Sequence, residues 1–185
     1  MRSFTATLES ISPYGQSHYH GIPKEDKENS ADYEARTWRE RMHTDTKGRV
    51  FIPPMAFKNC LRDAAKFLSI QIPGKGKATY TKHFKSGVLV TNPLQLEVKK
   101  DDVPGVWLFL PADGVTGSGK RVLKCFGRID HWAGDVTFTI LDDTITRDVF
   151  VDHLEQAGHF IGIGFFRPQN GGYWGRFAVK DVKGE

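Results

Sequence analysis

Apolar and polar residues alternate in several parts of the chain, and each alternation predicts a β-strand. The first strand is predicted at residues 3–12, where Phe4 and Leu8 belong to an apolar face and every second side chain is polar. Pro93 marks an edge strand or a bulge, because proline has no amide hydrogen for the ladder. Five further strands are predicted at residues 88–98, 106–111, 121–129, 135–141 and 173–182.

A helical period predicts the first of two helices at residues 52–70. Proline near its start is compatible with a first helical turn. One apolar stripe along this helix consists of Phe57, Leu61, Ala64, Ala65 and Leu68. A second, basic stripe lies beside it and consists of Lys58, Arg62 and Lys66. This basic stripe is either a solvated helix face or a surface for a polyanion.

The second helix is predicted at residues 144–158, with Gly158 as its C-cap. The resulting order of strands and helices is βαββαβ with an added hairpin, which is the split βαβ pattern of ferredoxin-like and RRM-like domains. We therefore expect an α+β fold and one modified RRM-like domain over residues 1–185. Three segments are expected outside its core: a loop or arm at 13–50, a basic loop at 71–87, and a hairpin or thumb-like insertion at about 99–132.

Composition narrows the function classes. The chain is 39% hydrophobic and 26% charged, has a net charge of +4, and holds no apolar run long enough for a transmembrane helix. Its first residues lack the apolar core of a secretory signal, so we expect a cytoplasmic protein without a membrane partner. Cys60 and Cys125 lie far apart and lack metal-ligand spacing, which predicts buried thiols in a reducing compartment. No cofactor and no metal site is predicted.

The segment GVTGSGK matches the glycine and lysine spacing of a phosphate-binding loop, through Gly114, Gly119 and Lys120. That chemistry needs Ser or Thr after the lysine and a helix behind the loop. Arg121 follows instead and begins a strand-like run. The segment is therefore interpreted as a hairpin tip, and an NTPase is excluded.

The segment 158–177 contains six glycines, together with Arg167 and Arg176. It follows a helix and precedes a strand, which is the wrong place for a dinucleotide fingerprint. Two interpretations stay open. The glycines, among them Gly162 and Gly164, permit close packing of the connection, or they let backbone amides approach a phosphate chain that the arginines neutralise. Its aromatic residues are either base-stacking surfaces or core.

Three histidines, His18, His20 and His43, fall in the polar region before the first helix. A loop histidine can be a general acid or base, a metal ligand, or a solvent-facing side chain. Without neighbouring carboxylates the metal signal is weak, and a solvent-facing role is the preferred interpretation.

Three segments resemble the RAMP superfamily of CRISPR-associated proteins. IPPMAFKNCLRDAA (52–65) resembles the opening of that superfamily's first helix. HLEQAGHFIGIGFFRPQNGGYWGRFAV (153–179) resembles its second helix, glycine-rich loop and last strand. HTDTKGRVFIP (43–53) resembles the segment that precedes the first helix in backbone subunits. Pro54 and Met55 depart from the usual Gly-Ser of the first motif.

The resemblance implies a subunit that binds CRISPR RNA, with guide RNA and other effector subunits as partners and possible self-association along the RNA. In that family a thumb contacts guide and neighbour, and residues 99–132 or 75–85 could serve here. Glu40 and Asp45 stand near the position of the cleaving aspartate of some backbone subunits without matching it, so a non-catalytic subunit is expected. The predicted RNA-binding residues are Lys58, Arg62, Arg167 and Arg176 first, then Arg39, Arg41, Lys120 and Arg121, with the backbone of Gly162 and Gly164.

Two alternatives remain open at this stage. One is a RAMP-type endoribonuclease that processes CRISPR RNA with His18, His20 or His43 as general acid or base. The other is an interaction protein that mimics a backbone subunit and binds effector subunits without RNA.

Overall fold

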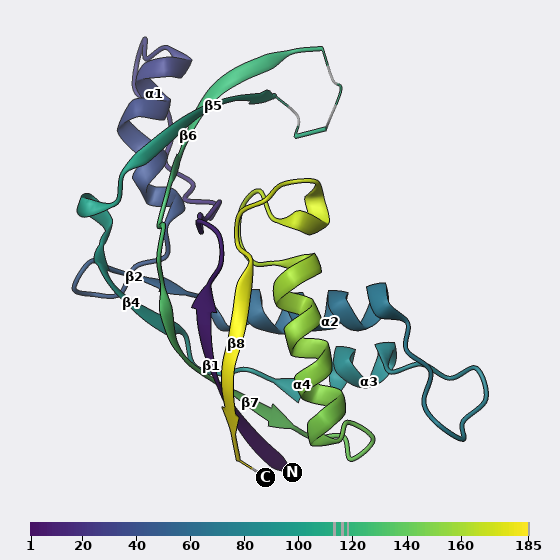
Figure 1. Ribbon diagram of the computed structural model, residues 1–185. Coiled ribbons are helices and arrows are strands. Elements are labelled where there is room, and N and C mark those ends of the chain that lie inside the picture. Colours follow the sequence, from purple (N-terminus) through teal and green to yellow (C-terminus); the bar gives the residue numbers. More distant parts are fainter. Residues whose placement is uncertain (113, 116, 118, 185) are drawn as a thin grey trace.

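The computed structural model describes residues 1–112, 114–115, 117 and 119–184. Its central sheet contains β1 (Arg2–Ser10), β3 (Val88–Leu89), β7 (Ala133–Ile140) and β8 (Phe177–Lys183) in the order β3-β7-β1-β8 (Figure 1). Every neighbouring pair in this sheet is antiparallel. The predicted α+β class is therefore confirmed.

Strand β1 has the two faces that its alternation predicts. Phe4, Ala6 and Leu8 are buried on one face. On the other face, the hydroxyl groups of Thr5 and Thr137 are hydrogen-bonded to each other at 3.0 Å. The Thr7 hydroxyl donates to Asp135 Oδ1 at 2.6 Å. The polar face is thus held by cross-strand pairs, while the apolar face is free to receive helices.

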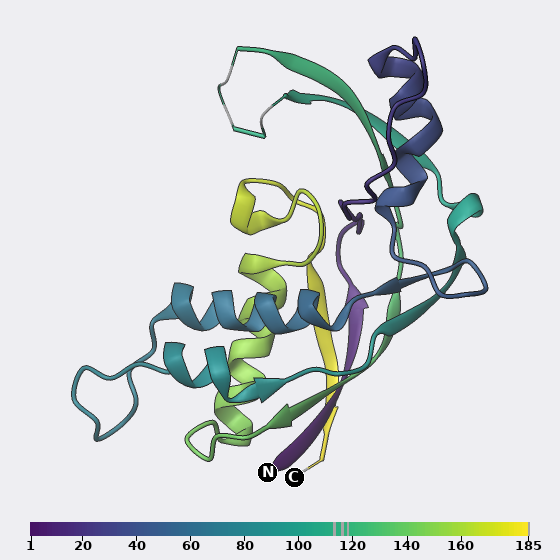
Figure 2. The same ribbon diagram turned by 180° about the vertical axis from the view of Figure 1, so that it is seen from behind.

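Two helices cover the apolar face of the sheet, α2 (Pro54–Leu68) and α4 (Arg147–Gln156) (Figures 1 and 2). Phe150 of α4 stacks on Phe4 with ring centroids 5.1 Å apart. Phe57 of α2 meets the ring of Phe177 edge-on at 6.3 Å. Helix α2 begins at a proline, as predicted, and ends at Ser69 in the left-handed conformation (φ 48°). Four residues of its predicted apolar stripe, Phe57, Leu61, Ala64 and Ala65, are buried in the core, and Leu68 is half-buried.

The second helix does not end at Gly158, so that prediction is wrong. The chain continues through a π-helical turn, η3 (Ala157–Ile161), and Gly162 is the residue that ends it, with φ 69°. Gly158 is instead needed for close packing, because a Cβ there would lie 2.1 Å from the carbonyl oxygen of Phe177. A single glycine signal cannot distinguish a cap from such a contact.

The strand predicted at 88–98 is interrupted at Pro93. Strand β3 pairs with β7, whereas β4 (Leu94–Lys99) pairs with β2 (Arg49–Ile52), a strand that alternation did not predict. The last strand is also shorter than predicted, because residues 173–176 belong to the bend before β8.

The polar segment 13–50 contains α1 (Ser30–Thr37) and the 3-10 turn η1 (Trp38–Arg41), which lie beside a hairpin (Figure 2). The hairpin consists of β5 (Gly105–Pro111) and β6 (Arg121–Gly127) and follows the turn η2 (Lys100–Asp102). A buried ion pair lies within this segment, where both Nη atoms of Arg41 donate to the carboxylate of Glu34, and each partner is also bonded to the hairpin. Arg41 Nη1 also donates to the carbonyl of Cys125 at 2.9 Å, and the Cys125 amide donates to Glu34 at 2.7 Å.

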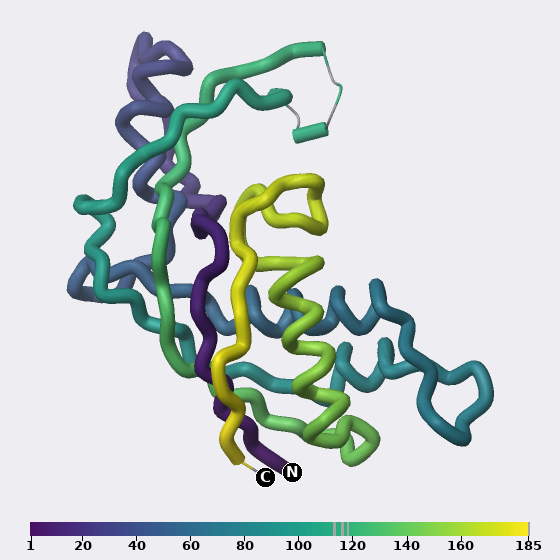
Figure 3. The backbone as a smooth tube through the Cα atoms, viewed as in Figure 1, coloured from purple at the N-terminus to yellow at the C-terminus, as the bar shows by residue number. Residues whose placement is uncertain are grey.

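The basic segment 71–87 is more ordered than a loop, because it contains helix α3 (Thr81–Ser86). The turn that carries Lys75 and Lys77 projects away from the hairpin end of the molecule (Figure 3). His83 contacts Asp142 through Nδ1 and Oδ2 at 2.6 Å, which links α3 to the turn after β7.

Both cysteines are buried and free, as predicted. Burial raises the pKa of the Cys125 thiol to about 11, so it is protonated at neutral pH. Among the described residues, no helix has both the length and the apolar character needed to cross a bilayer.

Candidate nucleic-acid interface

A groove of about 770 Å³ lies where four segments meet. Residues 14–19 and His43 form one side, and the start of α2 lies next to them. The inner face of the β5–β6 hairpin and the glycine-rich bend, defined as residues 158–177, complete it. Its lining residues include Tyr14, Ala56, Lys124, Phe126, Phe165 and Phe166.

Aromatic rings from both long walls meet in this groove. Phe126 of the hairpin and Phe165 of the bend stack with centroids 3.7 Å apart and planes inclined by 7°. Phe166 has φ 55°, a conformation that costs a bulky residue roughly 1–2 kcal/mol. Such strain persists only where the surroundings enforce it, and here the Phe166 carbonyl accepts the amide of Trp174 at 3.0 Å.

The backbone of the bend is bonded to the segment that contains Tyr14. The Phe165 amide donates to the carbonyl of Gly15 at 2.8 Å, and the Gly175 amide donates to that of Pro13 at 2.7 Å. On its other side, Tyr14 forms an antiparallel bridge with Ile129, just beyond the hairpin. The Tyr14 segment thus connects the two walls of the groove.

Close packing explains the two glycines named above as candidate phosphate contacts. The Gly162 amide donates to the carbonyl of Ala157 at 2.9 Å. Gly164 has φ 76°, and a Cβ there would lie 2.3 Å from the carbonyl oxygen of Gly15. Gly164 is therefore accounted for by its contact with the N-terminal segment, whereas Gly172 and Gly175 are accounted for by contacts within the bend, with the carbonyls of Phe166 and Ile163.

Replacing Gly164 with alanine is expected to lower the free energy of unfolding by about 1–3 kcal/mol more than replacing Gly171. Gly171 is the matched control because it lies in the same bend with φ 80° and has open space around its missing Cβ. Urea denaturation of both variants measures the difference. Equal destabilisation would show that backbone strain alone, and not the contact with Gly15, requires glycine at 164.

Two predicted arginines meet at one carboxylate. Arg62 Nη2 lies 2.7 Å and Arg167 Nη2 lies 3.5 Å from the side chain of Asp63. The basic stripe of α2 and the bend are therefore on the same side of the molecule, and two guanidinium groups there face one carboxylate. Arg176 donates to the carbonyls of His159 at 3.1 Å and Tyr173 at 3.2 Å, which holds the backbone of the bend.

The hairpin carries a second group of cations. In the hairpin ladder Arg121 lies opposite Pro111, which lines the groove. The backbone carbonyl of Lys120 accepts a hydrogen bond from the Ala112 amide at 2.8 Å. Lys124 lines the groove itself but was not among the RNA-binding residues predicted from the sequence. Its polar side chain between Leu123 and Cys125 in an alternating strand could have indicated an accessible cation. The phosphate-loop-like segment between these strands includes positions 116 and 118, which lie outside the described residues.

Three other predicted cations have contacts elsewhere in the fold. Lys58 Nζ donates to the carbonyl of Lys85 at 2.8 Å, at the end of α3, and burial together with the charge of Arg62 lowers the pKa of Lys58. Arg41 is held by Glu34, as described above. The Arg39 guanidinium lies over the ring of Trp38 at 4.2 Å.

The structure brings two of the three histidines together. His18 and His43 line the groove, with ring centroids 4.2 Å apart. Burial, and secondly the charge of His18, lowers the pKa of His43. Gln16 positions this pair, since its Oε1 accepts the His43 amide and its Nε2 donates to the carbonyl of Phe51 at 2.7 Å. His20 is separate, and its Nδ1 accepts the amide of Ile22 at 3.2 Å.

The acidic residues before α2 are engaged in ion pairs. Asp45 accepts Arg49 Nε at 2.9 Å, and Glu40 accepts Lys100 Nζ at 2.8 Å. Over the part of the chain that the structure describes, no three His, Cys, Asp or Glu side chains gather as metal ligands would.

Comparison with known proteins gives structural neighbours but no sequence relatives. No family model matches the chain, and no curated protein matches it. A solved chain described as a CRISPR RNA-guided surveillance complex is 13% identical with a TM-score of 0.34, over 83% of this chain and 58% of that one. The crystal structure of Cmr6 from Pyrococcus furiosus is 13% identical with a TM-score of 0.49, over 97% of this chain and 98% of that one. The chain is thus structurally similar to Cmr6 and to a chain of a CRISPR RNA-guided surveillance complex.

Proposed function

We propose that this protein binds single-stranded RNA in the groove between the hairpin and the glycine-rich bend, as a guide-binding subunit of a CRISPR ribonucleoprotein. The observation that carries the proposal is that one groove is lined by aromatic rings from both walls and by Lys124, with further cations on the hairpin and next to the bend. Aromatic faces stack on unpaired bases, and flanking cations neutralise the sugar-phosphate chain with little sequence preference.

The cations assigned to this role are Lys120, Arg121 and Lys124 of the hairpin, Arg167 of the bend, and Arg62 of α2. Lys58, Arg39, Arg41 and Arg176 are left out of the primary set because each contacts a carbonyl, a carboxylate or a ring of the fold itself. Arg62 and Arg167 are kept because they share the single carboxylate of Asp63, which leaves one positive charge of the three groups unbalanced. The backbone of Gly162 and Gly164 is assigned to packing.

The strand order supports a finer fold assignment within the same proposal. Helix α2 lies between β1 and β3 in the chain, and α4 lies between β7 and β8, while the sheet order is β3-β7-β1-β8. We assign this core to the ferredoxin-like, RRM-like βαββαβ arrangement and treat residues 1–185 as one domain. Guide RNA, other effector subunits and further copies along the RNA are the partners this assignment implies.

The test is filter binding of a labelled single-stranded RNA of mixed sequence at salt concentrations from 50 to 400 mM. With three to five phosphates neutralised, the slope of log affinity against log salt is expected to be about −2 to −3.5. A duplex of the same sequence is the control and is expected to bind more weakly, since its bases cannot stack on the groove. A slope near zero, or no binding at 50 mM, would contradict RNA binding by this groove.

Cleavage of RNA is a second candidate function, favoured by the adjacent imidazoles of His18 and His43 in the groove. Neutral and protonated imidazoles side by side are suited to act as general base and general acid without a metal. Incubating labelled repeat RNA in EDTA tests it: products lost in His43→Ala but retained in His20→Ala would assign cleavage to this pair.

A further inference from the structure

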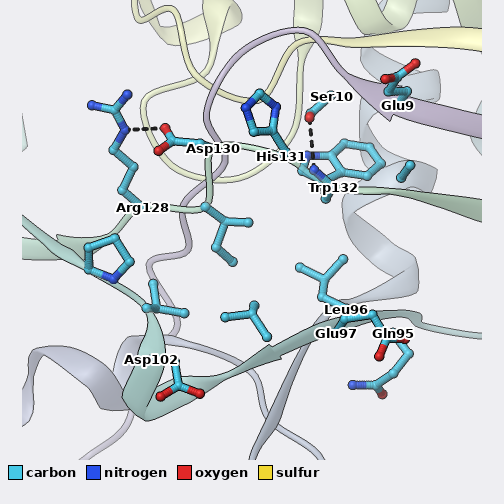
Figure 4. A pocket seen from close by; sticks show the side chains of 15 residues that line it. Glu9, Ser10, Gln95, Leu96, Glu97, Asp102, Arg128, Asp130, His131 and Trp132 are labelled. Atoms are coloured by element: carbon cyan, nitrogen blue, oxygen red, sulfur yellow. Dashed lines mark hydrogen bonds and ion pairs between the residues drawn. The ribbon is translucent and has the colours of Figure 1, made fainter.

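A second groove has a volume of about 810 Å³ (Figure 4). It shares no lining residue with the groove between the hairpin and the glycine-rich bend, hereafter the RNA groove. One wall is β4 together with the turn η2, and the other is the segment 128–132 after β6 with the first residue of β7 and the end of β1. The two walls approach at Leu94 and Gly134, where a Cβ on the glycine would lie 2.5 Å from Leu94 Cδ1. Beyond that contact the groove opens.

Strand β4, and β7 where it begins, have edges without a strand partner among the described residues. Strand β4 has β2 as its neighbour on one side only. Strand β7 pairs with β1 along its whole length, but on its other side β3 reaches only Thr139 and Ile140. Residues 95–98 of β4 line the groove, and β7 reaches it at Ala133. Such edges are acceptors for an added strand.

The floor of this groove is apolar and its rim is acidic. Leu96, Val103, Ile129 and Trp132 are buried at its base. Four carboxylates line it, those of Glu9, Glu97, Asp102 and Asp130. Arg128 is the one Lys or Arg among the lining residues and is paired with Asp130 at 2.6 Å, while Lys180 lies 3.2 Å from Glu9.

This concentration of carboxylates contrasts with the net charge of +4 of the whole chain. An acidic rim repels phosphate groups, so nucleic acid is a poor occupant. A cationic occupant with apolar side chains matches both the rim and the floor, and an extended backbone matches the free edges.

We propose that this groove binds an extended segment of another protein in which apolar side chains alternate with Lys or Arg. In an extended chain successive side chains point to opposite faces, so one set enters the apolar floor while the cations reach Glu97 and Asp102. This site is independent of the RNA groove.

Fluorescence anisotropy with a labelled, N-acetylated Val-Lys-Val-Lys-Val-Lys peptide tests the proposal on the full chain. Saturable binding is expected, and Glu97→Lys with Asp102→Lys should weaken it about 10-fold. The matched control is Asp148→Lys with Asp152→Lys on α4, which makes the same change in net charge at exposed positions outside the groove and should leave affinity within about twofold. A peptide with Glu in place of Lys should not bind.

Three outcomes would overturn this assignment. Absence of saturable binding, or equal weakening by both pairs of substitutions, would show that the rim does not recognise the peptide. Sedimentation that shows self-association of the wild-type chain, abolished by Glu97→Lys with Asp102→Lys, would assign the groove to a second copy instead. RNA affinity should change equally in the two pairs of variants, which have the same net charge, and this separates a failure of this site from a failure of the RNA groove.

Discussion

Replacing Arg41 with methionine is expected to lower the free energy of unfolding by about 3–5 kcal/mol. The side chains of Arg41 and Glu34 are 12% and 6% exposed, so removing the guanidinium leaves a carboxylate buried without its counter-charge. The same change removes the donor to the Cys125 carbonyl, one of the bonds between arm and hairpin. Urea denaturation followed by circular dichroism measures the effect.

Arg128→Met is the control for this prediction, because the Arg128–Asp130 pair is 41% and 51% exposed and should contribute less than about 1 kcal/mol. The double variant Glu34→Gln with Arg41→Met should recover part of the lost stability, since it no longer buries a charge. If Arg41→Met and Arg128→Met are equally mild, the arm is not held by this pair.

The Arg41 effect also has a defined pH dependence. Burial would raise the pKa of Glu34, but hydrogen bonds from Arg41 and the Cys125 amide outweigh it, and the pKa is lowered in the folded chain. A lowered pKa contributes stability above the unfolded pKa of about 4.3, and that contribution is lost as the pH falls through the folded value. The stability difference between wild type and Arg41→Met should therefore shrink below about pH 4.

Neutralising the hairpin cations through Lys120→Gln, Arg121→Gln and Lys124→Gln is expected to weaken single-stranded RNA binding about 50-fold at 0.15 M salt. Each phosphate contact on a single strand contributes about 0.7 to the salt slope, so the slope should become less steep by about 2. Filter binding across a salt series measures both quantities in the same experiment.

The matched control for the hairpin variant is Lys75→Gln, Lys77→Gln and Lys82→Gln, which removes the same charge from exposed positions in and beside the turn that projects away from the groove. Its RNA affinity should stay within about threefold of wild type. Equal losses in both variants would mean that net charge, and not the groove, governs binding. An unchanged salt slope in the hairpin variant would remove these three residues from the interface.

The elements with strong local periodicity were predictable, and their partners were not. The alternation around Phe4 and the apolar stripe through Leu61 identify β1 and α2, because the spacing of apolar residues shows which face of each element is buried. Strand β2 has only four residues and gains its regularity from pairing with β4, which no local pattern reveals. The end of α4 was misplaced for a similar reason, since the contact of Gly158 with Phe177 joins distant parts of the chain.

The cations of the site were likewise predictable in position but not in their contacts. Residue type and spacing identify Arg62 and Arg167 as basic positions on neighbouring elements, and they do meet at Asp63. The same criteria cannot separate them from Lys58 and Arg41, whose contacts with Lys85 and Glu34 arise only in the folded chain. Whether a charge is available to a ligand therefore depends on contacts that form only in the tertiary structure.

The bonds of the Tyr14 segment to both the bend and Ile129 have a consequence for how the RNA groove works. One short stretch of backbone spans the distance between its walls, so the spacing of Phe126 and Phe165 is set before any ligand arrives. A pre-organised groove loses little conformational entropy on association. Because Phe126 and Phe165 already stack on each other, a base is expected to stack on the half-buried rings of Phe165 or Phe166 and not between the two rings.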